Sequence, residues 1–201
     1  MGLHGSKQPE AQVLILGLDK AGKSTLLYKL RHDACVSTVP TIGFNVEMLE
    51  ARKKSVNFIL TLWDIGGQAK MRAHWKSFHQ DAAAVVFVVD SSEKERLEEA
   101  RKELENTLRS EQLRGLPLII LANKQDVDGA LTATEISDTF NLKKICSTRD
   151  WFIQPCSAKT GFGVQEALKR LVQLVKLPSD TATVKDSIKE TVHNLAASSR
   201  R

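Results

Sequence analysis

Cysteine is scarce in this chain: three occur among 201 residues, and none stands in a C-x-x-C spacing. This pattern excludes a disulfide framework or a structural zinc site and is typical of a reducing compartment. Long apolar runs are missing too, because no stretch approaches transmembrane length and the first residues lack the apolar core of a signal peptide. The last residues form no C-a-a-X box, so prenylation is not expected. We therefore expect a cytoplasmic protein, on the cytosolic side of membranes.

Long runs of positive charge are also absent, although lysine and arginine outnumber aspartate and glutamate by 29 to 24. In residues 93–104 the cations alternate with glutamates, which is typical of a solvated helix face with i,i+4 ion pairs. No basic cluster is interleaved with aromatic residues, so nucleic acid is not expected as a partner. With 42% hydrophobic residues, the chain is large enough to bury the core of one ordinary globular domain.

The most informative segment is 17–24, GLDKAGKS, which matches the phosphate-binding pattern G-x-x-x-x-G-K-[ST]. It follows an apolar run and precedes a helix-like run, the context in which backbone N–H groups cradle phosphate. Gly17 and Gly22 leave the backbone unobstructed, Lys23 can reach the β- and γ-phosphates, and the Ser24 hydroxyl can ligate Mg²⁺. The candidate nucleotide-binding residues here are Gly17, Leu18, Asp19, Lys20, Ala21, Gly22, Lys23, Ser24 and Thr25.

A second motif, N-K-Q-D at 123–126, follows the buried strand-like run 116–122 and indicates which base is bound. The Asp126 carboxylate can accept two hydrogen bonds from the N1–H and N2 amino groups of guanine, whereas adenine offers no donors there. Lys124 would lay its methylene stem along the ring, and Asn123 would brace neighbouring loops. An adenine-specific P-loop ATPase or kinase is therefore disfavoured.

A third motif, W-D-I-G-G-Q at 63–68, ends the apolar run 56–62. Asp64 is placed to hold Mg²⁺ through a water, and Gly67 would allow a backbone N–H to approach the γ-phosphate. Gln68 can donate and accept hydrogen bonds, which suits a catalytic residue that orients the attacking water.

Together these segments resemble the ADP-ribosylation factor (Arf) and Arf-like small GTPases. The resemblance rests on residues 17–24, 40–45 (PTIGFN), 63–68, 123–126 and 156–158, and it covers about 11–177. The Leu-Asp pair in the phosphate loop and the P-T-x-G-F-N string distinguish this group from Ras-type GTPases, and the chain is most similar to Arf-like proteins with a short amino terminus. The resemblance implies a GTP/GDP switch with Mg²⁺ as cofactor. It implies slow hydrolysis accelerated by a GTPase-activating protein, an exchange factor, and effectors recruited at a membrane, as in vesicle transport.

The resemblance also assigns residues. Thr41 would contact Mg²⁺ and γ-phosphate in the GTP state only, so Ser24 and Thr41 are the candidate metal ligands. Ser157 and Ala158 would approach guanine O6 through backbone N–H groups. An aromatic triad would face effectors in the GTP state, with ordinary core packing as the alternative; its members are Phe44, Trp63 and Phe78.

The two ends carry the membrane hypothesis. Residues 1–10 form a candidate acylation segment, because M-G-x-x-x-[ST] would allow myristoylation of Gly2. One myristoyl chain binds membranes with a constant of only about 10⁴ M⁻¹, so a second signal is needed. After the GTPase domain, 11–177, comes a polar tail at 178–201. Its apolar side chains at helical spacing could form an amphipathic membrane or partner helix, or the tail could be disordered. From these two signals we expect the protein to bind peripherally to the cytosolic face of a membrane.

Two departures from the family pattern keep an alternative open. Lys20 stands where the family usually has a small residue, and Ala69 stands where a polar residue is common. Either could produce a GTP-bound binding module that never cycles. The hairpin tip at 52–54 (Arg-Lys-Lys) is expected to be a solvated turn, with membrane or partner contact as the alternative.

The predicted fold class is α/β, a single Ras-like P-loop domain with a mostly parallel six-stranded sheet, one antiparallel strand and helices on both faces. We expect strands near 12–17, 43–50, 55–63, 83–90, 117–122 and 151–156, and helices near 23–31, 94–110, 132–139 and 164–177. The second and third strands should pair antiparallel because their link is short. Capping boxes are predicted at Ser92–Glu95 and Thr132–Glu135.

Overall fold

A six-stranded sheet organises the computed structural model, which describes residues 8–32 and 38–177. The strand order is β2-β3-β1-β4-β5-β6, and all neighbours are parallel except β2 and β3. The strands are β1 (Glu10–Leu16), β2 (Phe44–Lys53), β3 (Val56–Ile65), β4 (Ala82–Asp90), β5 (Leu118–Asn123) and β6 (Trp151–Pro155). The predicted fold class is confirmed, including the single antiparallel strand at one edge.

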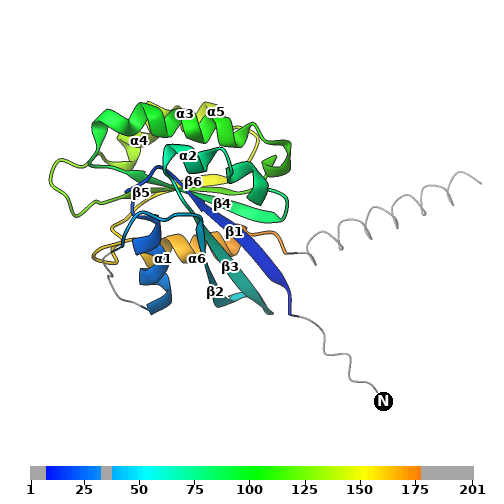
Figure 1. Ribbon diagram of the computed structural model, residues 1–201. Helices are drawn as coiled ribbons and strands as arrows, with labels where there is room; N and C mark the ends of the chain where they lie inside the picture. The colour runs from blue at the N-terminus through cyan, green and yellow to red at the C-terminus, as the bar shows by residue number, and fades with distance from the viewer. Residues whose placement is uncertain (1–7, 33–37, 178–201) are drawn as a thin grey trace, which may run out of the picture.

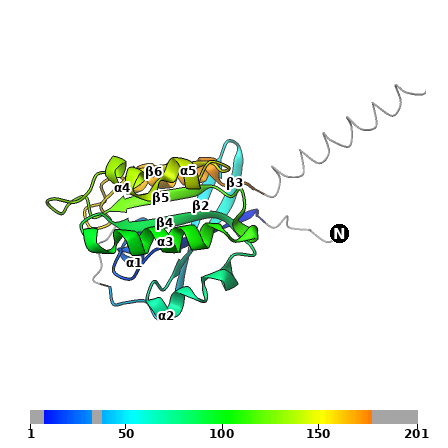
Figure 2. The ribbon, with the colours of Figure 1, turned by 90° about the horizontal axis from the view of Figure 1, so that it is seen from above.

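Helices cover both faces of the sheet (Figures 1 and 2). One face carries α1 (Lys23–His32) and α6 (Val164–Leu174), and the other carries α3 (Leu97–Leu108), α4 (Ala133–Phe140) and α5 (Leu142–Ile145). The short α2 (Ala69–Arg72) follows β3 at the margin of the sheet. None of the helices in the described ranges is long and apolar enough to span a membrane.

The sheet separates two apolar cores, and β1 shows how the sequence divides between them. Val13 and Ile15 pack into the core beneath α1 and α6, whereas Leu14 and Leu16 pack into the core beneath α3 and α4. Alternate side chains of a strand point to opposite faces, so a strand covered on both sides must be apolar throughout. For this reason the positions of the central strands could be predicted from continuous apolar runs in the sequence.

The sequence analysis did not predict the short elements. They are α2, α5 and the 3₁₀ turns at Trp75–Phe78, Lys94–Arg96 and Glu111–Leu113. The capping box at Thr132 and Glu135 is confirmed, with both reciprocal hydrogen bonds present. The box at Ser92 is wrong: its N–H and hydroxyl donate to Asp90 Oδ1, a 3₁₀ turn intervenes, and α3 begins only at Leu97 without a side-chain cap. The carboxylate at the end of β4 holds Ser92 before a helix can start.

The hairpin tip between β2 and β3 is tied to the domain. Lys53 Nζ donates a hydrogen bond to the Val175 carbonyl, at 2.6 Å, just after α6. The turn itself uses Lys54 in the left-handed region, with φ of 55°. The expected solvated turn describes the exposed Arg52 and Lys54 but not Lys53, which bonds a carbonyl group at the end of α6.

His79 is a buried titratable side chain at the end of the 3₁₀ turn that follows α2. It is 3% exposed; its Nδ1 lies 3.0 Å from the Ser110 hydroxyl after α3, and its Nε2 is buried without a hydrogen-bond partner. Burial, and to a lesser extent the positive charge of Lys76, lowers the pKa of His79 in the folded protein. The fold therefore favours the neutral imidazole.

We predict that this histidine makes the protein less stable in mild acid. The contribution of neutral His79 to the free energy of unfolding should be complete above the unfolded-state pKa of about 6.5. It should be lost as pH falls from that value towards the lower folded-state pKa. Urea unfolding of the wild type and of His79→Phe at pH 7.5 and pH 5.5 measures this. The wild type should lose more stability than the variant between the two pH values; equal losses would rule His79 out as the cause.

Candidate functional site

Loops from the carboxyl ends of the strands meet around a cleft of about 280 Å³. Its lining comes from the phosphate loop and the start of α1, from residues 38–41, from Gly67 and Gln68 after β3, and from Lys124 after β5. Open α/β sheets bind ligands at this edge, and the N-terminus of α1 adds N–H groups that suit an anion. The structure thus brings the three sequence motifs together.

The glycines of the phosphate loop are required by packing as well as by access to phosphate. A Cβ on Gly17, at φ of 139°, would lie 2.3 Å from the Val88 carbonyl oxygen of β4. A Cβ on Gly22, at φ of 97°, would lie 2.3 Å from Asn123 Nδ2. Lys20 adopts φ of 63° without being glycine, at a cost of roughly 1–2 kcal/mol. Its exposed side chain lines the cleft.

Lys23 places a buried cation over the phosphate loop. Its Nζ donates hydrogen bonds to the carbonyl oxygens of Gly17, at 3.0 Å, and Leu18, at 2.9 Å, and the residue is 5% exposed. Burial lowers the pKa of Lys23 to about 8, against the opposing pull of the Asp64 and Asp19 carboxylates. The Lys23 ammonium bonds only to neutral carbonyl oxygens, so a phosphate anion would be a favourable partner for its buried charge.

Ser24, Thr41 and Asp64 form the oxygen cluster predicted for Mg²⁺. Ser24 Oγ donates to Asp64 Oδ2 at 2.5 Å and lies 2.8 Å from Thr41 Oγ1. Asp64 is fully buried, and its Oδ1 has no hydrogen-bond partner. The residues fit Mg²⁺, which prefers oxygen ligands and takes few from the protein. The described part of the chain contains no group of three or more His, Cys, Asp or Glu side chains suited to a metal, so water and phosphate oxygens would complete the coordination.

Asn45 is a member of this cluster to which the sequence analysis gave no role. Its Nδ2 donates to Asp64 Oδ2 at 3.2 Å across the antiparallel β2–β3 pair. Its place in the P-T-x-G-F-N string was the only available signal. This bond engages Oδ2 and helps to fix the orientation of the Asp64 carboxylate.

The Gly67–Gln68 segment is held against the phosphate loop. The Gly67 carbonyl accepts hydrogen bonds from the Asp19 N–H, at 3.1 Å, and from Arg72 Nε, at 2.8 Å. A Cβ on Gly67 would lie 2.3 Å from the Gly17 oxygen, so this glycine is needed for close approach rather than for its dihedral angles. Gln68 precedes α2, makes no side-chain cap and lines the cleft. Its catalytic role stays a prediction.

The residues assigned to the base form a bonded group beside the cleft. Buried Asn123 donates to the Ala21 carbonyl at 2.8 Å and accepts from the Ala158 N–H at 2.9 Å. Ser157 donates its hydroxyl to Asp126 Oδ1 at 2.6 Å, and chiefly this bond lowers the pKa of Asp126. Asp126 is thus ionised, as an acceptor for two guanine donors must be.

Two details of this group were not anticipated. The Ser157 N–H donates to the Phe162 carbonyl at 2.9 Å, so the N–H groups of both Ser157 and Ala158 have partners within the protein. Their contact with guanine O6 stays a prediction. Lys124 pairs its ammonium with Asp90 Oδ2 at 2.5 Å, which fixes the stem that would lie along the base.

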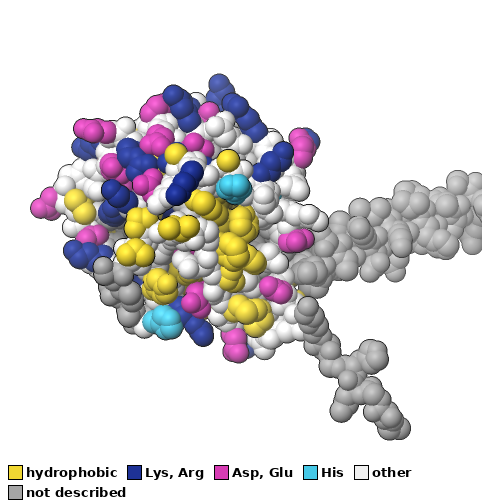
Figure 3. Space-filling model, in the orientation of Figure 1, with side chains coloured by type: hydrophobic (Ala, Val, Ile, Leu, Met, Phe, Trp, Pro, Cys, Tyr) yellow, Lys and Arg dark blue, Asp and Glu magenta, His cyan; other side chains and the backbone are white. Residues whose placement is uncertain are grey.

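The three rings of the predicted aromatic triad lie in contact with one another. Ring centroids lie 5.2 Å apart for Phe44–Trp63, 5.4 Å for Phe44–Phe78 and 5.9 Å for Trp63–Phe78. Trp63 and Phe78 are half-buried and pack against the core beneath α3 and α4, so the alternative of core packing describes them, whereas Phe44 is 49% exposed. Apolar side chains cross this face in the region of β2 and β3 (Figure 3), and the exposed ones include Ile42, Val46 and Met48.

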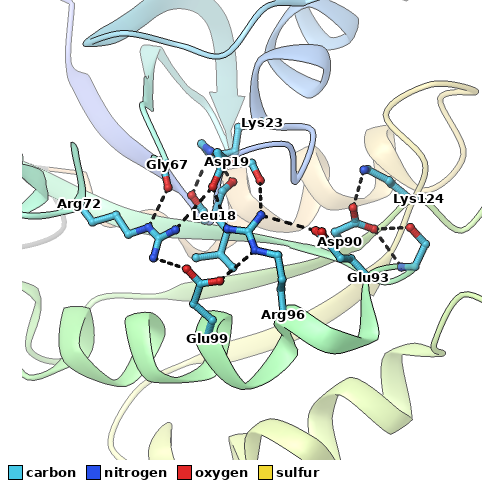
Figure 4. Close-up of polar contacts among 12 residues, drawn as sticks. Leu18, Asp19, Lys23, Gly67, Arg72, Asp90, Glu93, Arg96, Glu99 and Lys124 are labelled. Carbon is cyan, nitrogen blue, oxygen red and sulfur yellow. Dashed lines mark hydrogen bonds and ion pairs between the residues drawn. The ribbon is translucent and has the colours of Figure 1, made fainter. Parts of the chain in front are cut away.

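The sequence analysis missed two arginines that contact the phosphate-loop and Gly67 segments. Arg72 and Arg96 both lie within reach of the Asp19 carboxylate, and Glu99 of α3 joins them (Figure 4). No sequence pattern links residues 19, 72 and 96. Only the i,i+3 spacing of Arg96 and Glu99 carried a signal.

Comparison with known proteins decides the family. A model of the ADP-ribosylation factor family matches residues 2–175. The chain belongs to this family. It is 48% identical over 180 residues to ADP-ribosylation factor-like protein 14 of Mus musculus, which covers 88% of this chain and 92% of the relative. ADP-ribosylation factor-like protein 1 of Saccharomyces cerevisiae is 46% identical over 174 residues, covering 87% and 92%.

A solved structure agrees with this assignment. The small GTPase Arl6 (BBS3) of Trypanosoma brucei, with a bound nucleotide analogue, superposes with a TM-score of 0.72 at 31% identity. The match covers 81% of this chain and 95% of the other. The chain is thus an Arf-family small GTPase, a guanine-nucleotide-binding switch in a family whose members are generally GTP hydrolases.

We predict that Gly67→Ala separates the two loops. The added methyl cannot fit between Gly17 and Asp19, so the Asp19 N–H should lose its bond to the Gly67 carbonyl. One net hydrogen bond is worth about 1 kcal/mol, or roughly fivefold faster hydrogen exchange at the Asp19 amide. Exchange measured by NMR tests this, with the Leu26 amide, bonded to Gly22, as the internal control. Unchanged protection of Asp19 would show that the contact does not depend on glycine.

Proposed function

We propose that this chain is a GTP/GDP switch that hydrolyses GTP slowly and relies on a GTPase-activating protein for fast hydrolysis. The observation that carries the proposal is the shared cleft, where the phosphate loop faces both Thr41 and the Gly67–Gln68 segment. A γ-phosphate in this cleft would touch two separate loops, and its loss would release both. Family membership supports guanine nucleotide as the ligand.

Each group in the cleft has a role in this proposal. Lys23 binds the β- and γ-phosphate oxygens, and the ionised Asp126 carboxylate selects guanine. Ser24 and Thr41 would hold Mg²⁺ directly and Asp64 through water; the ion would supply charge neutralisation at the phosphates. Gln68 orients the attacking water with its side-chain amide. Exchange of GDP for GTP would require an exchange factor to open this closed set of contacts.

We expect fast hydrolysis to depend on a partner protein because the described part of the cleft lacks an arginine of its own. No arginine is among the described residues that line the cleft, and Arg72 and Arg96 are both engaged by the carboxylates of Glu99 and Asp19. An arginine supplied by a GTPase-activating protein is worth about 10³–10⁵ in rate. We therefore expect the isolated protein to turn over GTP very slowly.

Effector proteins would recognise the GTP-bound state through the aromatic triad. Phe44 and Trp63 lie on β2 and β3, the strands next to the Thr41 and Gly67 segments, so a change in either loop can alter the triad. An exposed apolar face of this kind suits an effector protein. Gly2 and the tail at 178–201 lie outside the described residues. A myristoyl group on Gly2 would place the switch on the cytosolic face of a membrane, in vesicle transport or effector recruitment.

Gln68→Leu tests the hydrolytic cycle. The substitution keeps the side-chain size but removes the amide that orients water, so hydrolysis stimulated by a family GTPase-activating protein should fall by about 10³-fold or more. GTP affinity should stay within about twofold, because the role proposed for Gln68 is to orient the water and not to bind the nucleotide. Phosphate release and equilibrium binding of a non-hydrolysable GTP analogue measure the two quantities.

Gln112→Leu, on an exposed turn far along the chain from the cleft, is the matched control and should behave as the wild type. Stimulated hydrolysis that survives in Gln68→Leu would remove Gln68 from its role. A wild type that binds GTP but shows no stimulated hydrolysis would favour the non-cycling module; the exposed Lys20 in the cleft is then the first residue to replace.

A further inference from the structure

The phosphate loop carries a carboxylate, Asp19, at the wall of a cleft built for polyphosphate. An ionised carboxylate beside bound phosphates repels them, and the repulsion grows with the charge of the nucleotide. GTP carries one more phosphate than GDP. The negative charge of Asp19 must therefore be neutralised or directed away from the cleft for the loop to bind a γ-phosphate.

Arg96 holds the carboxylate on the side of the loop that faces α3. Its Nη2 donates to Asp19 Oδ1 at 2.8 Å, and its Nη1 donates to the Asp19 carbonyl at 3.2 Å. Burial opposes ionisation of Asp19, but the hydrogen bond and charge of Arg96 outweigh it, and the pKa of Asp19 lies below its usual value. The carboxylate is thus ionised, paired and turned towards α3.

Arg96 is itself fixed before it meets the loop. Its Nε donates to Glu99 Oε2 at 2.9 Å, and Nη1 lies 3.6 Å from Glu93 Oε2. Figure 4 shows the guanidinium between Asp19 and Glu99, with Arg72 on the other side of Glu99. An arginine held by carboxylates of its own helix segment offers a preorganised pair of donors to the loop.

Arg72 adds a second positive charge that lies farther from Asp19. Its Nη2 lies 3.6 Å from Asp19 Oδ1, while Nη1 bonds Glu99 at 2.7 Å and Nε bonds the Gly67 carbonyl. Because Arg72 also fixes the Gly67 segment, replacing it would disturb two contacts at once. Arg96 touches the loop through Asp19 alone and is therefore the cleaner residue to test.

We propose that Arg96 is a positioning residue of the nucleotide site, which holds and neutralises the Asp19 carboxylate so that the phosphate loop accepts the γ-phosphate. The inference rests on the proposed GTP/GDP binding. Without Arg96 the Asp19 charge stays near the phosphates, and affinity falls more for GTP than for GDP. Removing the Asp19 charge as well cancels the defect, which a purely structural role of Arg96 does not predict.

The test measures dissociation constants of GDP and a non-hydrolysable GTP analogue, with Mg²⁺, for the full chain. Arg96→Met should weaken binding of the GTP analogue by about tenfold, as expected for a lost charge-assisted bond, and of GDP by less than about threefold. The double variant Asp19→Asn/Arg96→Met should return both constants to within about threefold of wild type. Arg96→Lys keeps the charge and should retain most of the preference.

Arg101→Met is the matched control, because Arg101 lies on the same helix and pairs with Glu98 and Glu105 away from the cleft. It should bind both nucleotides as the wild type does. Circular dichroism checks folding; if Arg96→Met does not fold, Arg96→Gln, which also removes the charge, provides the same comparison with and without Asp19→Asn.

Equal weakening of GDP and the GTP analogue in Arg96→Met, with no recovery in the double variant, would overturn the inference and leave Arg96 a structural residue. Failure of the wild type to bind either guanine nucleotide would instead overturn the proposed function. The two failures are therefore distinct.

Discussion

The close packing of the phosphate loop against its neighbours is the constraint on which the rest of the site depends. At Gly17, Gly22 and Gly67 an added Cβ would lie 2.3 Å from an atom of an adjoining loop or strand. Each contact joins the loop to a different part of the sheet: β4, the last residue of β5, and the loop after β3. Because interiors packed this tightly deform in steps rather than gradually, a ligand that moves one loop must also move the others. Such coupling is what a nucleotide switch requires.

Charge is sorted around this loop as a polyanion site demands. The buried Lys23 ammonium lies on the cleft side, and Asp64 keeps one buried oxygen without a partner. Asp19 is turned to α3 and paired with Arg96. The bonds of Ser157 to Asp126 and of Lys124 to Asp90 fix the group assigned to the base. Preorganised polar groups of this kind lower the cost of ordering the site when ligand binds.

The sequence predicted the sheet and the three motifs well, because buried parallel strands require unbroken apolar runs and phosphate loops require glycine at fixed spacing. It also predicted the cap at Thr132, which depends on two residues in one turn. The features that were not predicted from the sequence lack a local sequence pattern. Elements of three or four residues carry no periodicity, and Ser92 failed as a cap because Asp90 holds it. The Asp19–Arg72–Arg96 contacts join distant segments, and Ser157 acts through a hydroxyl that the family pattern does not assign.

The central claim, a guanine-nucleotide switch, is tested most directly by competition. Purified protein with Mg²⁺ and a bound fluorescent guanine nucleotide is titrated with GDP, GTP and ATP. The account predicts that GDP and GTP displace the probe at similar concentrations, and that ATP is weaker by at least about a hundredfold because Asp126 meets no donors on adenine. Equal displacement by ATP would contradict the base assignment. Displacement by GTP with far weaker displacement by GDP would contradict cycling between the two states.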